Sequence, residues 1–453
     1  MALKSINPAN GNVIAEYEEH TREQVEDILT AVHDAFGAWR ETTFAERGTL
    51  FKKLAAGLRA NKADYARLMA EEMGKPVTEA AGEVEKCAWL SGYMAEHAAG
   101  MLADESVASD ATKSYVAFRP LGVIFGIMPW NFAFWQVLRY AVPAMMAGNT
   151  TVLKHANNVT GAAMALEKLF TDCGFPPDAF RVLVIDIPAI RGVIEHPRVA
   201  AVTLTGSTGA GKAVGAAAGA VIKPSVLELG GSDPLIVLED ADLDAAAGLG
   251  CKSRLISNGQ CCISAKRFIV VESVREDFEQ KLVARMAAAR LGDPLDETTT
   301  LGPMARPDLR ENLDRQVKES VAKGARVLLG GEPGAGAYYP ATVLTDVAAG
   351  MPAYGEELFG PVAAVIAVKD AAEAVRVAND NVYGLGAAIF STDAARAERI
   401  ARDEIEAGAC FVNALVKSDP RLPFGGTKLS GYGRELGSYG LKEFVNIKTI
   451  FVA

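Results

Sequence analysis

VIFGIMPWNFAFWQVLRYAVPAMMAGNTTVLK, residues 123–154, contains an alternation of apolar runs and helical composition that indicates the fold class. The apolar runs VIFGIM and TTVLK at its two ends predict strands, and the residues between them predict a loop and a helix. The pattern recurs along the chain, where apolar runs are separated by stretches of helical composition such as Gly161–Phe170. Further runs of this kind are RVLVI, AVTLTG, PLIVL, RFIVV, ARVLLG and VAAVIAV. Short strands that alternate with helices form mainly parallel sheets, so we expect an α/β protein with enough strands for two sheets.

The part of this stretch from Leu121 to Gly148 is long enough to cross a bilayer and carries one formal charge, Arg139. It is nevertheless interrupted by polar residues and prolines, which lipid tolerates poorly. The interrupting residues are Pro129, Asn131, Gln136 and Pro143. We therefore expect a buried strand, a loop and a helix of a soluble protein with no membrane partner.

Helices are expected to open the chain. Thr21 followed by Gln24 forms a capping box ahead of apolar residues at helical spacing. A second amphipathic helix is expected near Ala45 to Arg59, and a third is expected to end near Gly74, just before Pro76.

Length and charge limit the class of protein. A chain of 453 residues is too long for one hydrophobic core, so two or more domains are expected. The formal net charge is −10, and Lys and Arg are not clustered, which argues against nucleic acid as a partner. Six cysteines in so long a chain favour a reduced compartment, and the N-terminus lacks the apolar segment of a signal peptide, so a cytoplasmic location is expected. Zinc-type Cys/His spacing is absent from the sequence, and no metal site is predicted.

The segment NGQCC, residues 258–262, could supply a nucleophile. Two adjacent cysteines cannot form an ordinary disulfide, so each thiol is either reactive or a small buried apolar group. A thiolate attacks a carbonyl well and leaves readily from a thioester.

Two further motifs could serve the same chemistry. Glu228 lies between leucines in LELGG, and burial there would raise its pKa and make it a base near neutral pH. Asn131 in PWNF offers an uncharged amide donor for an oxyanion. Taken singly, a surface glutamate and a turn asparagine explain these residues equally well.

The segment GSTGAGK, residues 206–212, has Walker A spacing, so a P-loop NTPase is an alternative. Ala213 stands where a P-loop NTPase needs the hydroxyl that binds magnesium. A P-loop NTPase is therefore a much weaker alternative. A glycine-rich turn from strand to helix still presents backbone N–H groups that suit a dinucleotide pyrophosphate. Val214 replaces the third glycine of the usual dinucleotide fingerprint.

Taken in order, eight segments over nearly the whole chain resemble the aldehyde dehydrogenase superfamily. They are INPANGNVI (6–14), PWNF (129–132), TVLKHA (151–156), TGS (205–207), LELGG (227–231), NGQCC (258–262), EELFGPV (356–362) and PFGGTKLSGYGRE (423–435). The last segment and LKHA look most like the bacterial succinate-semialdehyde dehydrogenase branch.

The resemblance implies a Rossmann-like NAD(P)-binding domain at 1–101 and 121–230 and an α/β catalytic domain at 231–430. It also implies a small β oligomerisation flap at 102–120 and 431–453, and hence a homodimer or homotetramer. It implies Cys262 as nucleophile, Glu228 as base and Asn131 as oxyanion donor, with NAD or NADP as cofactor and a small aldehyde as substrate. The residues implied for cofactor binding are Trp130, Lys154, Asn157, Gly206, Ser207, Leu229, Glu357 and Phe359.

The sequence departs from the family pattern at two positions near these motifs. Ala133 follows PWNF where the family usually has proline, which would loosen the loop that carries Asn131. Asn157 is neutral where relatives that prefer NAD often have an acid, so the 2′-phosphate of NADP is not repelled.

For the substrate, Arg139 is the informative residue, either as a fork for a distal carboxylate or as an arginine that extends to solvent or pairs at a subunit contact. The second arginine expected of a succinate semialdehyde site is replaced by Ile256, and Ser418 and Arg421 could compensate. Glutarate semialdehyde or a sulfonated aldehyde would also suit such a pocket. A non-catalytic relative of the lens-crystallin type is disfavoured because Cys262 and Glu228 are both retained.

Overall fold

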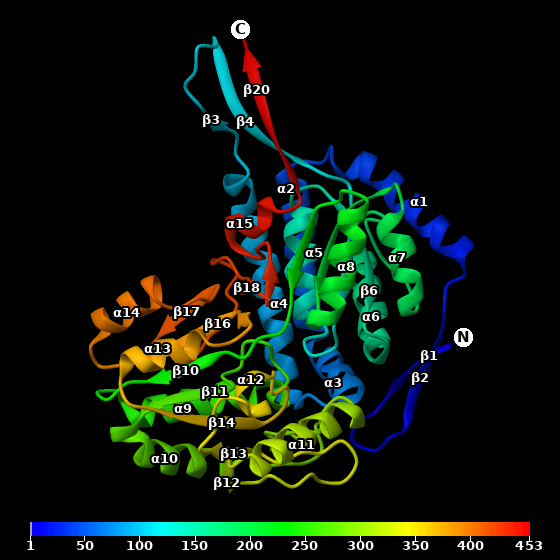
Figure 1. Ribbon diagram of the computed structural model, residues 1–453. Coiled ribbons are helices and arrows are strands. Elements are labelled where there is room, and N and C mark those ends of the chain that lie inside the picture. The colour runs from blue at the N-terminus through cyan, green and yellow to red at the C-terminus, as the bar shows by residue number, and fades with distance from the viewer. Residues whose placement is uncertain (1) are drawn as a thin grey trace.

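The computed structural model describes residues 2–453, which form two α/β lobes and a projecting β arm (Figure 1). One lobe holds a six-stranded sheet in the order β19-β9-β8-β5-β6-β7, and the other a seven-stranded sheet in the order β12-β13-β14-β11-β10-β16-β17. Each sheet is parallel except at one edge, where β19 and β12 run antiparallel to their neighbours. This confirms the predicted α/β class and the two sheets.

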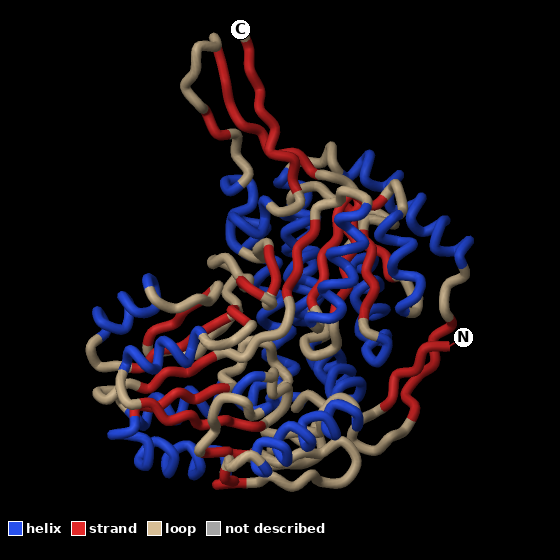
Figure 2. The backbone as a smooth tube through the Cα atoms, viewed as in Figure 1, coloured by secondary structure: helices blue, strands red, loops and turns tan. Residues whose placement is uncertain are grey.

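The first sheet lies between two groups of helices, as the tube view shows (Figure 2). Side chains of α1, α7 and α8 cover one face, and side chains of α4, α5 and α6 pack against the other. Its strands are β5 (Val123–Met128), β6 (Thr150–His155), β7 (Phe180–Val182), β8 (Val199–Thr205), β9 (Ser225–Glu228) and β19 (Gly431–Tyr432). Its helices are α1 (Arg22–Trp39), α2 (Phe44–Ala60), α3 (Lys62–Met73), α4 (Val77–Met101), α5 (Trp135–Met146), α6 (Thr160–Asp172), α7 (Ile187–Glu195) and α8 (Thr208–Ala220).

The second sheet is covered in the same way, by α9 and α10 on one face and by α11 to α14 on the other. Its strands are β10 (Pro234–Val237), β11 (Arg267–Val271), β12 (Arg326–Leu329), β13 (Thr342–Thr345), β14 (Val362–Val368), β16 (Gly386–Phe390) and β17 (Ala409–Val412). Its helices are α9 (Leu243–Leu255), α10 (Arg275–Ala287), α11 (Pro307–Ala322), α12 (Pro352–Gly355), α13 (Ala371–Asn379) and α14 (Ala394–Asp403).

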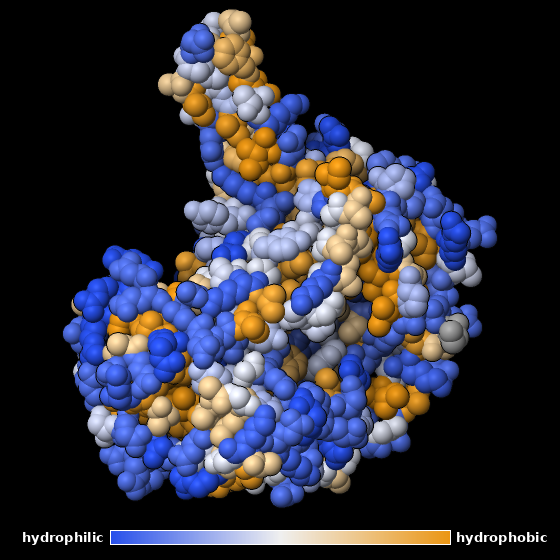
Figure 3. Space-filling view, in the orientation of Figure 1, coloured by the Kyte–Doolittle hydropathy of each residue, from blue (hydrophilic) through white to orange (hydrophobic). Residues whose placement is uncertain are grey.

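The arm consists of β3 (Glu105–Ser106), β4 (Lys113–Pro120) and β20 (Val445–Val452), with β20 antiparallel to β4 along its whole length. The space-filling view shows apolar side chains over this arm (Figure 3), and Ile447 and Phe451 are more than half exposed. β19 falls within the predicted flap segment 431–453 but pairs with β9 of the first sheet, and α15 (Gly437–Lys442) lies between β19 and β20. Two small antiparallel sheets of two strands each complete the fold, β1 (Ala2–Ile6) with β2 (Val13–Glu18) and β15 (Tyr383–Gly384) with β18 (Thr427–Lys428).

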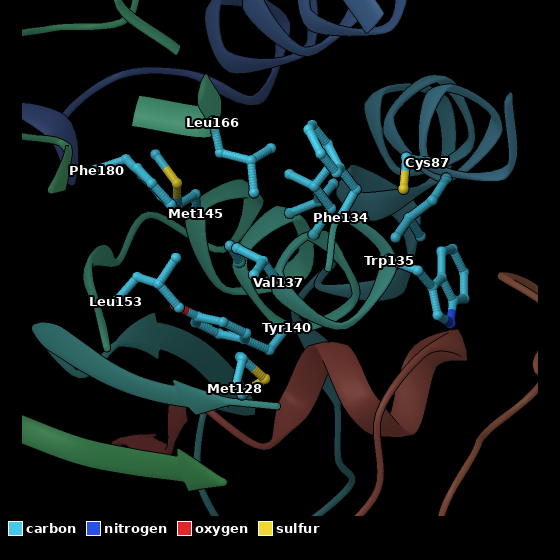
Figure 4. Packing of buried hydrophobic residues seen from close by; sticks show 14 of the residues in the cluster. Cys87, Met128, Phe134, Trp135, Val137, Tyr140, Met145, Leu153, Leu166 and Phe180 are labelled. Atoms are coloured by element: carbon cyan, nitrogen blue, oxygen red, sulfur yellow. The ribbon is translucent and has the colours of Figure 1, made fainter. Parts of the chain in front are cut away.

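The stretch 123–154 folds as predicted into strand, loop, helix and strand. Every residue of β5, α5 and β6 is buried, which explains why this stretch carries so few charges. Tyr140 of α5 lies so close to β5 that a Cβ at Gly126 would be 2.1 Å from its ring, so only glycine fits there. Figure 4 shows Val137 and Met145 of the same helix among the core side chains. Across residues 2–453, no helix is long and apolar enough to cross a membrane.

The expected helices at the start of the chain are also present. Thr21 caps α1, and the capping box with Gln24 is complete. The second predicted helix corresponds to α2, and α3 ends at Gly74, whose φ of +78° closes the helix in the left-handed conformation that glycine adopts readily.

Candidate active site

Two cavities meet at Cys262. The larger, of about 1440 Å³, is lined by residues of both lobes, and the smaller, of about 100 Å³, lies beside α5. Among residues 2–453, only Cys262 and Gln136 line both cavities. A group bound to the Cys262 sulfur could therefore face both spaces at once.

Parallel strands of the first sheet deliver residues to the larger cavity. β5, β6 and β8 run in the same direction, so their carboxyl ends share one edge of the sheet, which is where such sheets bind ligands. Asn131, Lys154 and Ser207 follow or end these strands, and all three line the cavity.

All eight residues predicted to bind the cofactor line the larger cavity. Gly206 and Ser207 form the turn from β8 into α8, and Ser207 caps the helix by accepting a hydrogen bond from the Ala210 N–H at 3.3 Å. The N-terminus of this 13-residue helix therefore faces the cavity, and it is suited to a pyrophosphate. The others are Trp130, Lys154, Asn157, Leu229, Glu357 and Phe359.

Lys212, the Walker-type lysine, is exposed and is not among the residues that line either cavity. The cavity side of α8 is instead formed by small apolar residues, Ala210, Ala213 and Val214. The turn can therefore bind phosphate through its backbone, but the lysine of a P-loop NTPase is not in place.

The segment before Cys262 is held in a conformation that few residues adopt. Ser257 and Asn258 have φ angles of +53° and +58°, and at Gly259 a Cβ would lie 2.3 Å from the backbone of Gly360. Asn258 stabilises its own position by donating hydrogen bonds to the carbonyls of Gly74 and Pro303, at 2.7 and 2.8 Å. This network presents the cysteines on a rigid support.

Asn131 lies beside this segment and is almost fully buried. Its side-chain Nδ2 donates one hydrogen bond to the Gln260 backbone carbonyl at 2.7 Å. Its backbone carbonyl accepts one from the Ser257 hydroxyl at 3.0 Å. The amide has two N–H groups, so the second remains available to an oxyanion at Cys262. The Nε2–H of His155 donates a hydrogen bond to the Ala133 carbonyl at 2.9 Å, which ties the loop despite the missing proline.

Cys261 and Cys262 share a hydrogen bond between their side chains. This bond lowers the pKa of Cys261 to about 6, assisted by Lys266, and raises the pKa of Cys262. Position favours Cys262 as the nucleophile, because Cys261 lines only the smaller cavity whereas Cys262 also lines the larger one.

Lys266 was not predicted, yet it connects the two parts of the site. Its ammonium donates to the carbonyls of Cys261 and Cys262 at 2.9 and 2.7 Å, and it lies 3.5 Å from the Glu357 carboxylate in the larger cavity. The lysine precedes an apolar strand in the sequence, where no local pattern distinguishes it from a surface residue.

Glu228 ends β9 and is buried, and one of its carboxylate oxygens has no hydrogen-bond partner within residues 2–453. Burial raises its pKa to about 8, the nearby Arg139 opposes this shift, and Glu435 adds to it. Glu228 is not among the residues that line either cavity. Its carboxyl group belongs to a buried cluster with Arg139 and Glu435 behind the site.

Of the residues predicted to bind substrate, Arg139 and Ser418 line the smaller cavity and Arg421 does not. Arg139 forms an ion pair with Glu435 and lies over the ring of Phe424 at 4.7 Å. Arg421 is exposed and pairs with Asp419 at 2.7 Å. Lys86 also lines this cavity, although no sequence motif points to it.

Comparisons with known proteins agree with this geometry. A model of the aldehyde dehydrogenase family matches residues 1–450. The chain is 46% identical over its whole length to a probable succinate-semialdehyde dehydrogenase [NADP(+)] of Synechocystis sp., all of which it covers. It is also 46% identical to the succinate semialdehyde dehydrogenase [NAD(P)+] of Escherichia coli, over 99% of this chain and 97% of that one. The structure of succinic semialdehyde dehydrogenase from Streptococcus pyogenes in complex with NADP+ superposes over all of both chains, with a TM-score of 0.97 and 36% identity.

Proposed function

The chain belongs to the aldehyde dehydrogenase family, and we propose that it oxidises succinate semialdehyde to succinate with NADP as the hydride acceptor. We infer the substrate from the small cavity beside Cys262, to which Lys86 and Arg139 contribute positive charge. The two relatives named above, both succinate-semialdehyde dehydrogenases by name, support the same choice.

In the proposed reaction, the Cys262 thiol loses its proton to solvent through the larger cavity that it lines, and the thiolate attacks the carbonyl carbon of the aldehyde. The free N–H of the Asn131 amide and the Cys262 backbone N–H stabilise the alkoxide that forms. When bound, the nicotinamide supplies the hydride acceptor, and loss of hydride from the substrate carbon leaves an acyl thioester on Cys262. The cradle of Gly206 and Ser207 at the N-terminus of α8 fits the pyrophosphate of such a cofactor.

Glu228 then takes a proton from water, and the hydroxide displaces the thiolate to release the acid. Because its carboxyl group is directed into the cluster behind the site, the side chain has to turn toward Cys262 for this step. A pKa of about 8 leaves the group able both to accept and to give up a proton near neutral pH.

The substrate proposal is tested with the purified enzyme, NADP and two aldehydes of four carbons. We expect kcat/KM for succinate semialdehyde to exceed that for butyraldehyde by about tenfold or more, because only the former offers a carboxylate to the cations of the cavity. Parallel assays with glutarate semialdehyde and a sulfonated short aldehyde measure the effect of a longer chain and of a sulfonate in place of the carboxylate. Equal values for succinate semialdehyde and butyraldehyde would contradict the proposal.

For the cofactor, we expect Asn157→Glu to weaken NADP far more than NAD. Asn157 lines the larger cavity and accepts a hydrogen bond from the Lys154 ammonium at 2.6 Å, so a carboxylate there would neutralise the lysine and repel a 2′-phosphate. Titration of cofactor binding by fluorescence gives the two dissociation constants. Equal weakening of NAD and NADP would show that Asn157 does not face the adenosine ribose.

The exposed apolar arm favours association between copies of this chain, as a homodimer or homotetramer. β20 is an edge strand of the arm's small sheet, and its unpaired edge can accept a strand from another copy. Analytical sedimentation of the intact chain tests this association, and a monomer at assay concentrations would contradict it.

A further inference from the structure

Two glutamates on α4 accept hydrogen bonds from the backbone of both loops that form the active site. The Oε1 atom of Glu83 accepts the N–H groups of Phe134 and Trp135, both at 2.9 Å, at the start of α5. Glu79, one turn earlier on α4, accepts the Ser257 N–H at 2.7 Å. Residues four apart lie on the same face of a helix, so one side of α4 holds both loops.

The Glu83 carboxylate belongs to a buried ion pair. Glu83 and Lys75 are 5% and 1% exposed, and the second carboxylate oxygen of Glu83 pairs with the Lys75 ammonium. The same ammonium lies 3.8 Å from the centre of the Phe132 ring, in the loop before α5. Apolar residues of similar volume in place of a buried ion pair often leave a protein equally stable or more stable, so stability alone does not account for this pair.

The contacts with α4 lie close to the two donors proposed for the alkoxide. Phe134 follows Asn131 by three residues in the same loop. The Ser257 hydroxyl donates to the Asn131 backbone carbonyl at 3.0 Å, and the Asn131 Nδ2 donates to the Gln260 backbone carbonyl at 2.7 Å. The loop and the nucleophile segment are thus joined to each other and to α4. These contacts determine where the Asn131 amide lies relative to the Cys262 backbone N–H.

We propose that Glu83 and Glu79 are positioning residues for the oxyanion site. Glu83 fixes the loop that carries Asn131. Glu79 fixes the segment that carries Cys262. Of the residues that the structure describes, those lining the two cavities include neither glutamate, so both act through the loops. The inference rests on the proposed reaction, in which Asn131 stabilises the alkoxide, and it applies to any aldehyde.

The test compares two double variants that both remove the buried charges and differ only in the hydrogen-bond acceptor. Lys75→Met with Glu83→Gln keeps an oxygen for the two N–H groups, whereas Lys75→Met with Glu83→Met removes it. An oxyanion donor has to lie about 2.7–3.1 Å from the developing charge, and a displacement of about 1 Å costs up to about a hundredfold in rate. We therefore expect kcat in the second variant to be about ten- to a hundredfold lower than in the first, with an unchanged dissociation constant for NADP. Glu85→Met, at an exposed glutamate of the same helix, controls for the substitution as such.

A double-mutant cycle shows whether Glu83 acts through Asn131. In Asn131→Ala enzyme the side-chain oxyanion donor is already absent, so the two double variants are expected to have equal kcat in that background. Alkylation of Cys262 by iodoacetamide forms no oxyanion, and its rate is expected to be the same in both double variants. A glutamate that only stabilised the fold would lower kcat in either background and would slow alkylation as well.

Glu79 is tested by comparing Glu79→Gln with Glu79→Met. Glutamine keeps an oxygen that can accept the Ser257 N–H, and methionine does not. We expect kcat to fall by about tenfold or more only in Glu79→Met, because the nucleophile segment is then no longer fixed to α4. Equal kcat in the two variants would remove Glu79 from the proposal.

The outcomes separate this inference from the reaction on which it rests. If Asn131→Ala alone leaves kcat unchanged, the proposed role of Asn131 fails, and the inference fails with it. If Asn131→Ala lowers kcat but the two double variants turn over equally, only the assignment of Glu83 is overturned. A difference between the double variants that persists in the Asn131→Ala background also overturns it, in favour of a general effect on the fold. Should Lys75→Met with Glu83→Met not fold, Glu83→Asp keeps the charge, shortens the side chain by one methylene and is expected to lower kcat in the same way, and wild-type kcat in Glu83→Asp would overturn the assignment.

Discussion

Replacing Cys262 with alanine is expected to abolish aldehyde oxidation, with a loss of roughly 10⁴- to 10⁶-fold in kcat, as for other enzymes that lose their nucleophile. Cys262 lines both cavities, so only its sulfur can hold the substrate carbon where the hydride acceptor can reach it. Formation of reduced cofactor, followed by its absorbance, measures the effect.

The neighbouring thiol provides the matched control. Cys261→Ala is expected to keep most of the turnover, because Cys261 does not line the larger cavity. Since Cys261 raises the pKa of Cys262, its removal should also shift the acid limb of the pH profile to lower pH. Loss of activity in Cys261→Ala together with retention in Cys262→Ala would reverse the assignment.

Glu228→Gln is expected to slow the steady state by about 10²- to 10⁴-fold, because an amide cannot accept the proton of the attacking water. If the residue acts only in release of the acid, rapid mixing should still show a burst of reduced cofactor before the slow phase. In the wild-type enzyme, deacylation should quicken as pH rises through about 8, since the raised pKa keeps the carboxyl protonated below that value.

Two results would change this role for Glu228. Disappearance of the burst in Glu228→Gln would mean that the carboxylate also activates the thiol. Turnover equal to that of the wild type would remove Glu228 from the mechanism.

The fold could be predicted from local pattern because its strands are short, apolar and buried on both faces. β5 and β14, for example, read as uninterrupted apolar runs, which parallel sheets between helices require. The end of the first lobe was harder to locate. β19 has only two residues, and its pairing with β9 depends on a contact between segments about two hundred residues apart, which no local pattern records.

In the candidate site, too, some residues can be predicted from a local motif and others only from the fold. Cys262, Asn131 and the turn at Ser207 could be located from motifs, because each depends on a short segment with a fixed backbone. Lys86 and Lys266 could not, since a lysine in a helix or before a strand usually lies at the surface, and only the fold shows what surrounds it. The pairing of Arg139 with Glu435 joins positions 296 residues apart (435 minus 139), so the sequence could not show that this guanidinium already has a partner.

Cys262 is expected to carry the acyl group, and its position can be determined by trapping the intermediate. Glu228→Gln enzyme is mixed with succinate semialdehyde and NADP, quenched in acid and digested. The peptide that contains both cysteines is then fragmented between residues 261 and 262 in a mass spectrometer. The mechanism predicts a succinyl group on the fragment that carries Cys262, and a succinyl group on Cys261, or none on either residue while reduced cofactor forms, would contradict it.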